Sequence, residues 1–238
     1  MKISVIIPAY NEEKNIASTL DAIFASDYPN FEVIVIDNAS TDATHVIASK
    51  TGARVIREDR KGTMWACEAG RKIAHGDIIV RLDADCLPEK SWLARGATWF
   101  ADKKISAVSG PYDYFDGPKT FRNLSLFFQK YFYAPLSYIL SLGRKGGVLI
   151  GGNSFMRATA LEKIGGFNTS IVFYGDDSDV AKRISSQGKI VFDNALILKT
   201  SARRFKAEGT LKIGTLYIFN FFKIMLSPVR NGKKKRIL

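Results

Sequence analysis

Short apolar runs alternate with amphipathic segments along the first part of the chain, and this alternation restricts the possible folds more than any other feature. The strand-like runs lie at 3–8, 31–37, 53–56 and 77–85. The segments between them show helical spacing, as in Ile16, Leu20, Ile23 and Phe24, and we expect Asn11 to cap that first helix. Helical connections of this kind join parallel strands by right-handed crossovers. The pattern predicts an α/β fold with a mostly parallel central sheet and helices on both faces.

Polar or acidic residues follow three of these predicted strands. Tyr10 follows the first strand, which we expect to stop at Pro8, and Asp37 ends the second. Asp83 lies at the end of the fourth strand, and Asp85 comes two residues later. Ligands of parallel sheets bind beyond the carboxyl ends of the strands, so we expect these side chains to meet in one crevice.

The two carboxylates at the end of the fourth strand are separated only by the small residue Ala84. Side chains alternate along a strand, so Asp83 and Asp85 share a face only if the extended geometry continues to the end of the run. Carboxylates suit hard divalent cations such as Mg²⁺ or Mn²⁺, which also bind substrate phosphates. The alternative is a solvated acidic turn that closes a strand.

Length and composition favour a folded enzyme-sized domain. The chain has 238 residues, of which 46% are hydrophobic and 24% charged, so disorder is not expected. We divide the chain into a domain at 1–200, with two halves at 1–110 and 111–200, and a terminal segment. The remaining 201–238 form an amphipathic, basic C-terminal extension.

The cysteines and the termini suggest a reduced, cytoplasmic setting. Cys67 and Cys86 have no metal-binding spacing, and no secretory pattern opens the chain. The formal charge is +12, part of which comes from the run 233–236. Such a tail favours an anionic membrane surface or merely aids solubility, and we expect no nucleic-acid partner. The oligomeric state is left open.

Several motifs occur in order over roughly the first 195 residues, and together they resemble the family 2 glycosyltransferases, which have the GT-A fold and invert configuration. The motifs are Val5-Ile6-Ile7-Pro8-Ala9-Tyr10-Asn11-Glu12-Glu13, Val35-Ile36-Asp37-Asn38-Ala39-Ser40-Thr41-Asp42, Ala74-His75-Gly76-Asp77 before Leu82-Asp83-Ala84-Asp85, Gly151-Gly152-Asn153-Ser154-Phe155-Met156-Arg157, Ile164-Gly165-Gly166-Phe167 and Gly175-Asp176-Asp177-Ser178-Asp179.

The resemblance implies a nucleotide-sugar donor, most often linked to UDP or GDP. It makes 1–200 a GT-A catalytic domain, with a nucleotide-sugar half at 1–110 and an acceptor half at 111–200. It places Pro8, Ala9, Tyr10 and Glu12 around the base and ribose, with Asp37 accepting a hydrogen bond from the base. A carboxylate pairs with uracil or guanine N–H groups and repels the acceptor nitrogen of cytosine, so Asp37 disfavours CDP donors. We expect three further residues near the nucleotide: Gly62, Asp83 and Ala84.

The resemblance also implies a divalent cation, Mn²⁺ or Mg²⁺. It assigns Asp85 to direct contact with the metal and Asp83 to the ribose or metal side. Some relatives supply a later histidine to the metal, but His45 and His75 both precede this motif. We therefore expect metal binding without donor to be weak.

Acidic and basic residues later in the chain are candidates for acceptor chemistry. By position in the family pattern, Asp177 is the catalytic base, and Asp176 replaces a more usual glutamate. The alternative is that these acids favour the N-terminus of a helix. Arg203 and Arg204 either contact the donor diphosphate or acceptor, or form ordinary salt bridges.

Two aromatic segments, 119–142 and 211–226, suggest amphipathic helices, with Pro135 interrupting the first. Neither has the uninterrupted apolar length of a membrane span. They fit interfacial helices at a membrane surface, or helices packed on the domain or in a dimer.

These observations predict a metal-dependent inverting glycosyltransferase that transfers a sugar from a UDP- or GDP-sugar to an acceptor hydroxyl. We expect a carbohydrate or lipid-linked acceptor, such as a lipid-linked or cell-envelope glycan, and a protein that is cytoplasmic or peripheral on the inner membrane face. One alternative is a sugar-1-phosphate nucleotidyltransferase, although the glycine-rich loop expected after its first strand is replaced by Pro8-Ala9-Tyr10-Asn11. Another is a non-enzymatic protein that binds anions or a membrane surface through its net charge.

Overall fold

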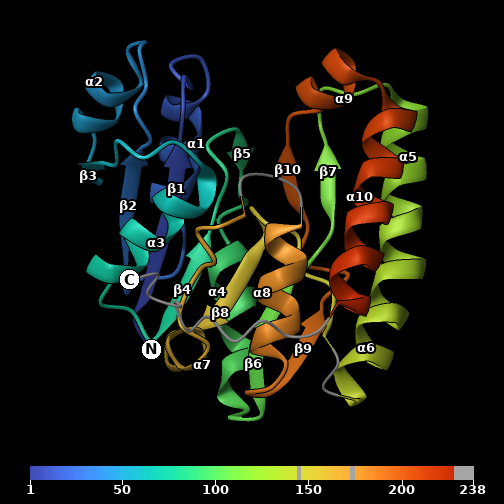
Figure 1. Cartoon of the computed structure of the whole chain (residues 1–238). Coiled ribbons are helices and arrows are strands. Elements are labelled where there is room, and N and C mark those ends of the chain that lie inside the picture. Colours follow the sequence, from blue (N-terminus) through green and yellow to red (C-terminus); the bar gives the residue numbers. More distant parts are fainter. Residues whose placement is uncertain (144–145, 172–174, 228–238) are drawn as a thin grey trace, which may run out of the picture.

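The computed structural model describes residues 1–143, 146–171 and 175–227. At its centre is a seven-stranded sheet in the order β3-β2-β1-β4-β8-β6-β9, in which β8 runs against its neighbours (Figure 1). Its strands are β1 (Ile3–Ala9), β2 (Phe31–Asp37), β3 (Arg54–Arg57), β4 (Ile78–Arg81), β6 (Ile105–Ser109), β8 (Ser154–Arg157) and β9 (Lys189–Phe192). The predicted α/β fold with a mostly parallel sheet is confirmed.

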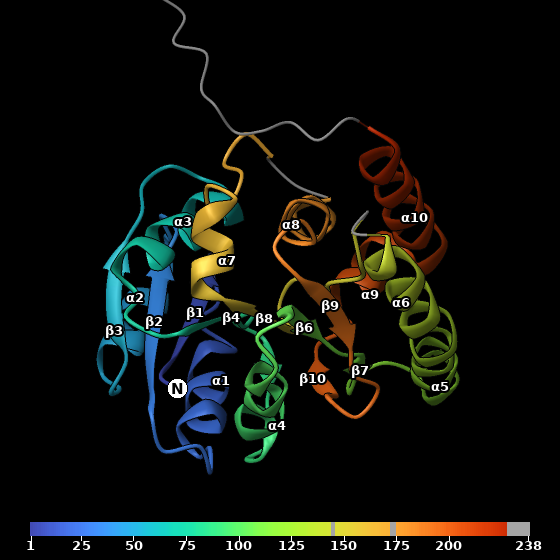
Figure 2. The same cartoon turned by 90° about the horizontal axis from the view of Figure 1, so that it is seen from below.

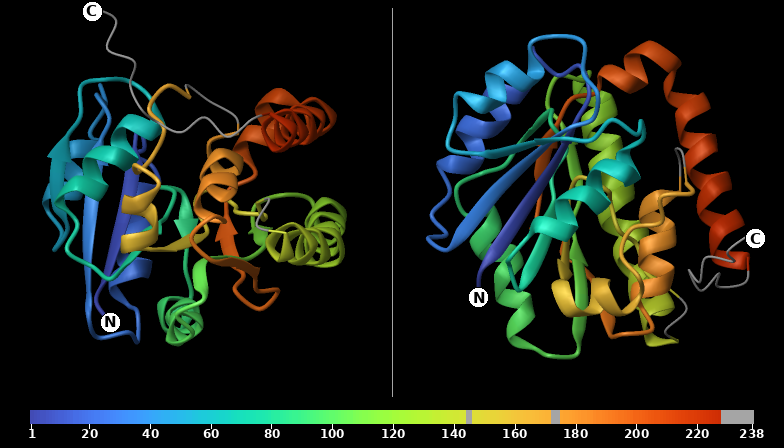
Figure 3. Two further views of the ribbon diagram at one scale, coloured as in Figure 1. Left: turned by 60° about the horizontal axis from the view of Figure 1, so that its bottom comes forward. Right: turned by 60° about the vertical axis from the view of Figure 1, so that its left-hand side comes forward.

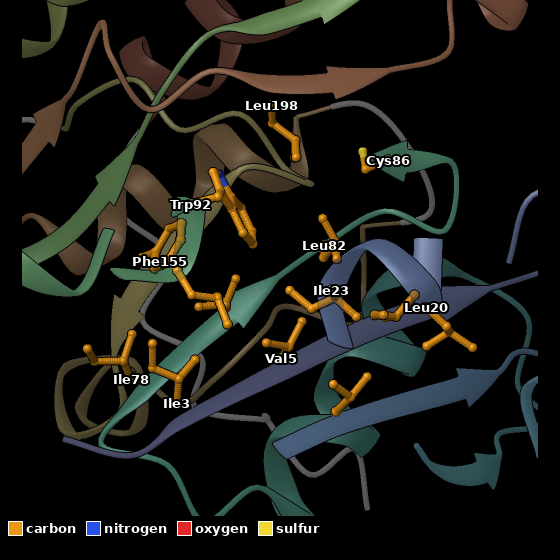
Figure 4. Packing of buried hydrophobic residues seen from close by; sticks show 14 of the residues in the cluster. Ile3, Val5, Leu20, Ile23, Ile78, Leu82, Cys86, Trp92, Phe155 and Leu198 are labelled. Atoms are coloured by element: carbon orange, nitrogen blue, oxygen red, sulfur yellow. The ribbon is translucent and has the colours of Figure 1, made fainter. Parts of the chain in front are cut away.

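Helices cover both faces of this sheet (Figure 2). Successive side chains of β1 face opposite sides, so that Val5 and Ile7 join one buried cluster and Ile6 joins the other. One face carries α1 (Ile16–Phe24), α2 (Thr44–Ser49), α4 (Trp92–Thr98) and the 3₁₀ turn Trp99–Ala101. The other carries α3 (Thr63–Ile73), α7 (Ala158–Lys163) and α8 (Asp176–Ile184). Figure 4 shows the first cluster, where Leu20 and Ile23 of α1 lie near Val5 and Leu82.

Two local predictions at the start of the chain were wrong. Strand β1 does not stop at Pro8 but continues to Ala9. Pairing of β1 with β4 ends at Ile6, so the N–H that Pro8 lacks is not needed for a hydrogen bond to β4. Asn11 does not cap α1, which begins at Ile16. Instead Asn11 has a positive φ of 55°, and its side-chain oxygen accepts the Thr41 N–H at 2.9 Å.

A small second sheet and a helical layer complete the fold. This sheet has the order β5-β10-β7 and consists of β5 (Cys86–Leu87), β7 (Tyr112–Tyr114) and β10 (Leu198–Thr200). The layer includes α5 (Lys119–Phe128), a π-helical turn (Gln129–Tyr133), α6 (Ala134–Leu142), α9 (Arg203–Glu208) and α10 (Thr210–Leu226). Pro135 lies in the first turn of α6, so the regular α-helix is interrupted just before it, as predicted.

The C-terminal helix α10 packs on the rest of the protein rather than standing apart from it. Lys182 of α8 donates from Nζ to the carbonyls of Ile224 and Met225 at 2.6 and 2.9 Å, which satisfies carbonyls at the end of α10. Helices α10, α5 and α6 lie on the same side of the molecule (Figures 1 and 3). Within the described residues, no helix combines the length and apolarity needed to cross a membrane. The basic run 233–236 lies outside the described residues.

Close packing between α4 and β8 yields a prediction about stability. A Cβ at Gly96 would lie 2.3 Å from the buried Phe155 ring, so Gly96→Ala should lower the free energy of unfolding by about 1–3 kcal/mol. Gly214 on α10 has nothing within 4 Å of the same position, so Gly214→Ala should raise it by roughly 0.5–1 kcal/mol through helix propensity. Urea denaturation measures the free energy of unfolding of both variants. Equal changes in the two would show that the Phe155 ring leaves room for a side chain at Gly96.

Candidate active site

Strands β1, β2 and β4 are parallel, so their carboxyl ends lie along one edge of the sheet. Tyr10, Asp37 and Asp83 follow or end these strands there, as predicted. The Tyr10 side chain is exposed, and the Lys61 ammonium lies 5.3 Å from its ring centroid. The loops after β1 and β3 are therefore neighbours along this edge, where an aromatic face is open to solvent.

Asp37 is completely buried at the end of β2. Its Oδ1 accepts the Ser40 N–H at 3.0 Å, and its Oδ2 accepts from Arg57 at 3.2 Å and lies 3.3 Å from His45 Nδ1. These contacts show that Asp37 anchors the turn after β2. Its predicted hydrogen bond to a nucleotide base stays a prediction.

Four other residues predicted to contact the nucleotide differ in which of their atoms are accessible at this edge. The side chains of Ala9 and Ala84 are buried in the core, so only their backbone atoms are suited to meet a ligand. Pro8 is partly buried. Gly62 has φ 131° and donates its N–H to Asn38 at 2.8 Å, which ties the start of α3 to the end of β2.

Asp83 and Asp85 lie in a turn and not on an extension of β4. The strand ends at Arg81, and the turn is closed by the Cys86 N–H donating to the Asp83 carbonyl at 3.2 Å. The expected strand to residue 85 was therefore wrong, because the chain turns to form β5. The two acids are nevertheless close enough to interact: burial, followed by the Asp83 charge, raises the pKa of Asp85 to about 7.

Arg203 connects this acid pair to the loop after β1. Its guanidinium donates to both carboxylate oxygens of Glu12, with a distance of 2.8 Å for the Nη1 to Oε2 bond, and its Nε lies 3.1 Å from Asp85 Oδ2. Glu12 also accepts from Asn15 at 2.8 Å. Three predicted site residues, distant in sequence, thus form one ion cluster. Arg204 has a different role, because it pairs with Glu208 at 3.4 Å and bonds Tyr217 at 3.2 Å.

A second arginine, Arg81, connects Asp83 to Asp176 at the start of α8. Its Nη1 donates to Asp176 Oδ2 at 2.5 Å, and its Nε lies 3.6 Å from Asp83 Oδ1. A Cβ at Gly151 would lie 2.9 Å from this guanidinium, and one at Gly152 would lie 2.4 Å from the Asp83 carboxylate. The two glycines therefore make room for Arg81 and Asp83.

Asp177, the predicted base, lies in the first turn of α8, beside Arg81. Its Oδ1 accepts the Ser178 N–H at 2.7 Å, and it lines a small cavity with Arg81 and Gly151. Burial and the neighbouring Asp176 charge raise the pKa of Asp177 to about 7, against the opposing effect of Arg81. A carboxylate with such a pKa is suited to exchanging a proton near neutral pH.

Aromatic residues hold α9 over the acid pair. The Phe205 ring packs 5.0 Å from Tyr114 and 5.2 Å from Phe121, measured between centroids. Asp116 accepts the Ala202 N–H at 2.6 Å, just before α9. The small sheet and α5 therefore fix the backbone that carries Arg203.

The chemistry of these side chains fits a divalent cation. Asp83, Asp85 and Glu12 offer oxygen ligands. The Arg203 guanidinium lies between Glu12 and Asp85, where its positive charge takes the place of a cation's. No group of three or more potential metal ligands is arranged to hold an ion within the ranges that the structure describes. Such a site suits a cation that also takes ligands from a substrate phosphate.

Two residues that shape the site were missed in the sequence. Arg81 interrupts the apolar run Ile78-Ile79-Val80, and a charge inside a buried strand is a signal that a carboxylate partner exists. Tyr112 donates its hydroxyl to Asp83 Oδ2 at 3.0 Å, and nothing in the sequence distinguishes it from other tyrosines.

Comparisons with known proteins show the family to which the chain belongs. Residues 4–165 match the family model described as "Glycosyl transferase family 2". The chain is 30% identical over 240 residues to "Glycosyltransferase AglE" of Haloferax volcanii, covering 95% of this chain and 77% of that protein. It is 28% identical over 210 residues to the "Dolichyl N-acetyl-alpha-D-glucosaminyl phosphate 3-beta-D-2,3-diacetamido-2,3-dideoxy-beta-D-glucuronosyltransferase" of Methanococcus voltae, covering 82% of this chain and 57% of that one.

A solved structure is also similar. The mannosyltransferase PcManGT from Pyrobaculum calidifontis, in complex with GDP-Man and Mn²⁺, superposes with a TM-score of 0.73 at 26% identity. The match covers 95% of this chain and 65% of that one. This chain therefore spans about two thirds of the length of PcManGT and 57% of the length of the Methanococcus relative. By its family model, its relatives and its GT-A fold, the chain belongs to glycosyl transferase family 2.

Proposed function

We propose that the chain transfers a sugar from a UDP- or GDP-sugar to an acceptor hydroxyl, with the help of a divalent cation and with inversion at the anomeric carbon. The observation that carries this proposal is the ion cluster of Glu12, Asp85 and Arg203 beside Asp83 at the carboxyl edge of the sheet. Ligands of parallel sheets bind at this edge. The GDP-Man and Mn²⁺ bound by PcManGT support a similar donor and cation here.

In this proposal Asp85, with Asp83, holds Mn²⁺ or Mg²⁺ together with the donor diphosphate. The cation would supply neutralising charge for the nucleoside diphosphate as it leaves. The Tyr112 hydroxyl orients Asp83 by donating to its Oδ2, and the buried Arg81 guanidinium lies beside its Oδ1. Pro8, Tyr10, Asp37 and Gly62 would surround the nucleoside.

The acceptor side of the reaction is assigned to α8. Asp177 would take the proton of the acceptor hydroxyl as its oxygen attacks the anomeric carbon, which accounts for inversion in one displacement. Asp176 is held by Arg81 and is therefore a positioning residue, or a contact to the acceptor. Family membership favours this reaction over the nucleotidyltransferase and anion-binding alternatives.

A lipid-linked acceptor at a membrane surface is part of the proposal. The name of the Methanococcus relative includes a dolichyl phosphate sugar, which supports a lipid-linked substrate. Helices α5, α6 and α10 and the π-helical turn expose large apolar side chains, and lysines lie on α5, the π-helical turn and α10. The most exposed are Leu124, Phe127, Tyr131, Phe132, Tyr138, Ile139, Leu142, Phe219, Phe222 and Leu226. We place these helices against the anionic inner face of the cell membrane.

The donor site is tested by Asp85→Asn. Loss of this carboxylate should reduce Mn²⁺-dependent turnover of the donor by about 100-fold or more, because charge on the leaving group is no longer neutralised. Turnover of a panel of UDP- and GDP-sugars is measured, with unchanged urea denaturation as the control for folding. Turnover close to that of the unmodified chain would remove Asp85 from the site.

The catalytic base is tested by the pH dependence of transfer. A base must be deprotonated, so kcat should fall as the pH drops below about 7, the value to which burial raises the pKa of Asp177. Asp177→Asn should slow transfer by about 10²–10⁴-fold, leave nucleotide binding intact and abolish this pH step. If donor binding and transfer decline together, Asp177 has a structural role instead.

Membrane attachment is tested with the double variant Phe219→Ser and Phe222→Ser. Removing two exposed aromatic side chains from α10 should lower sedimentation with phosphatidylglycerol vesicles several-fold. Val46→Ser on α2, at the other end of the sheet, also removes an exposed apolar side chain and serves as the matched control. Equal sedimentation of all three proteins would favour a role for these helices in packing or dimerisation.

A further inference from the structure

Arg203 occupies the place where the proposed metal site needs positive charge. Its guanidinium bridges Glu12 and Asp85, which are contributed by the loop after β1 and the turn after β4. The two carboxylates are largely buried, at 10% and 13% side-chain exposure, whereas the Arg203 side chain is 49% exposed. The arginine therefore covers the acids from the solvent side, where a ligand would arrive.

The acids require such a cation because they lie close together in a poorly solvated place. Asp85 and Glu12 share one cation, because the Arg203 guanidinium contacts the carboxylates of both, and Asp83 lies two residues from Asp85 in the same turn. A divalent ion at Asp85 would compensate the same charges. A guanidinium 3.1 Å from Asp85 Oδ2 and a divalent ion on the same carboxylate would repel each other in this poorly solvated place, so Arg203 and a metal compete for Asp85.

We propose that Arg203 is an internal latch on the donor site. In the metal-free protein it serves as the counter-ion of Asp85 and Glu12. A divalent cation together with a nucleoside diphosphate displaces it from Asp85, and the released guanidinium then pairs with the diphosphate. The identity of the displacing ligand rests on the proposed function, but the competition between Arg203 and the cation does not require sugar transfer.

The exchange needs only a movement of the Arg203 side chain. The backbone of α9 is held by the packing of Phe205 on Tyr114 and by the Asp116 bond to the Ala202 N–H. A long, half-exposed side chain on a fixed helix can change partners without unfolding its support. The latch therefore makes metal binding weak in the absence of nucleotide and cooperative with it.

The latch is tested by measuring free Mn²⁺ with electron paramagnetic resonance while the full chain is titrated. Without nucleotide, Arg203→Ala should bind Mn²⁺ about tenfold more tightly than the unmodified chain, because the competing ion pair is gone. With GDP or UDP present, the gain should shrink or reverse, because the variant lacks the guanidinium that pairs with the diphosphate. Asp85→Asn should bind Mn²⁺ weakly in both conditions.

Lys206→Ala is the matched control, because Lys206 is on the same helix and pairs with Asp116 at 3.2 Å instead of with the donor-side acids. It should bind Mn²⁺ as the unmodified chain does. Equal Mn²⁺ affinity of Arg203→Ala and the unmodified chain, or an equal gain in Lys206→Ala, overturns the latch. Tighter Mn²⁺ binding by Arg203→Ala without turnover of any nucleotide sugar by the unmodified chain would keep the latch and contradict the proposed function.

Discussion

Charge compensation at the carboxyl edge of the sheet is the constraint on which the rest of this structure depends. Glu12, Asp83, Asp85 and Asp176 bring four carboxylates toward one region where the protein excludes much of the water. Buried charges of one sign are unfavourable unless cations lie beside them. Two arginines, and in the proposed reaction a divalent ion, supply that positive charge.

The two arginines differ in how firmly they are held. Arg81 is buried in β4, and Gly151 leaves the space for its guanidinium, so its link between Asp83 and Asp176 is a fixed part of the core. Arg203 reaches the acids from α9 and is half exposed. The acids therefore lie between a buried arginine and a half-exposed one, and the half-exposed one is the arginine that we propose to change partners.

The same arrangement joins the two halves of the chain. Arg81 connects Asp83 to the start of α8, where the proposed base Asp177 lies. Arg203 connects the loop after β1 to α9, which packs through Phe205 on Phe121 of α5. Binding of a donor and approach of a membrane-bound acceptor would therefore act on neighbouring ion pairs.

Sequence patterns predict the alternation of strands and helices and the placement of Tyr10, Asp37 and Asp83 at one edge of the sheet, because parallel strands must end at a common edge. The predictions fail where a tertiary contact overrides a local signal. Asn11 is a good capping residue, yet its side chain bonds a loop thirty residues away.

The ion pairs of the site are the part that local patterns do not reveal. No spacing rule connects Arg203 with Glu12 and Asp85, because their contact depends on how α9 packs on the small sheet. The turn at Asp83 and the burial of Ala9 and Ala84 likewise follow from packing around β5 and α1. Family motifs identify such residues as candidates without giving their partners.

A crystal structure of the chain with Mn²⁺ and GDP or UDP tests the central claim most directly. The account predicts a cation bound to Asp85 and the diphosphate, the base near Tyr10 and Asp37, and the Arg203 guanidinium moved from Asp85 to a phosphate oxygen. A nucleotide bound elsewhere, with the pair between Arg203 and Asp85 intact, would contradict it.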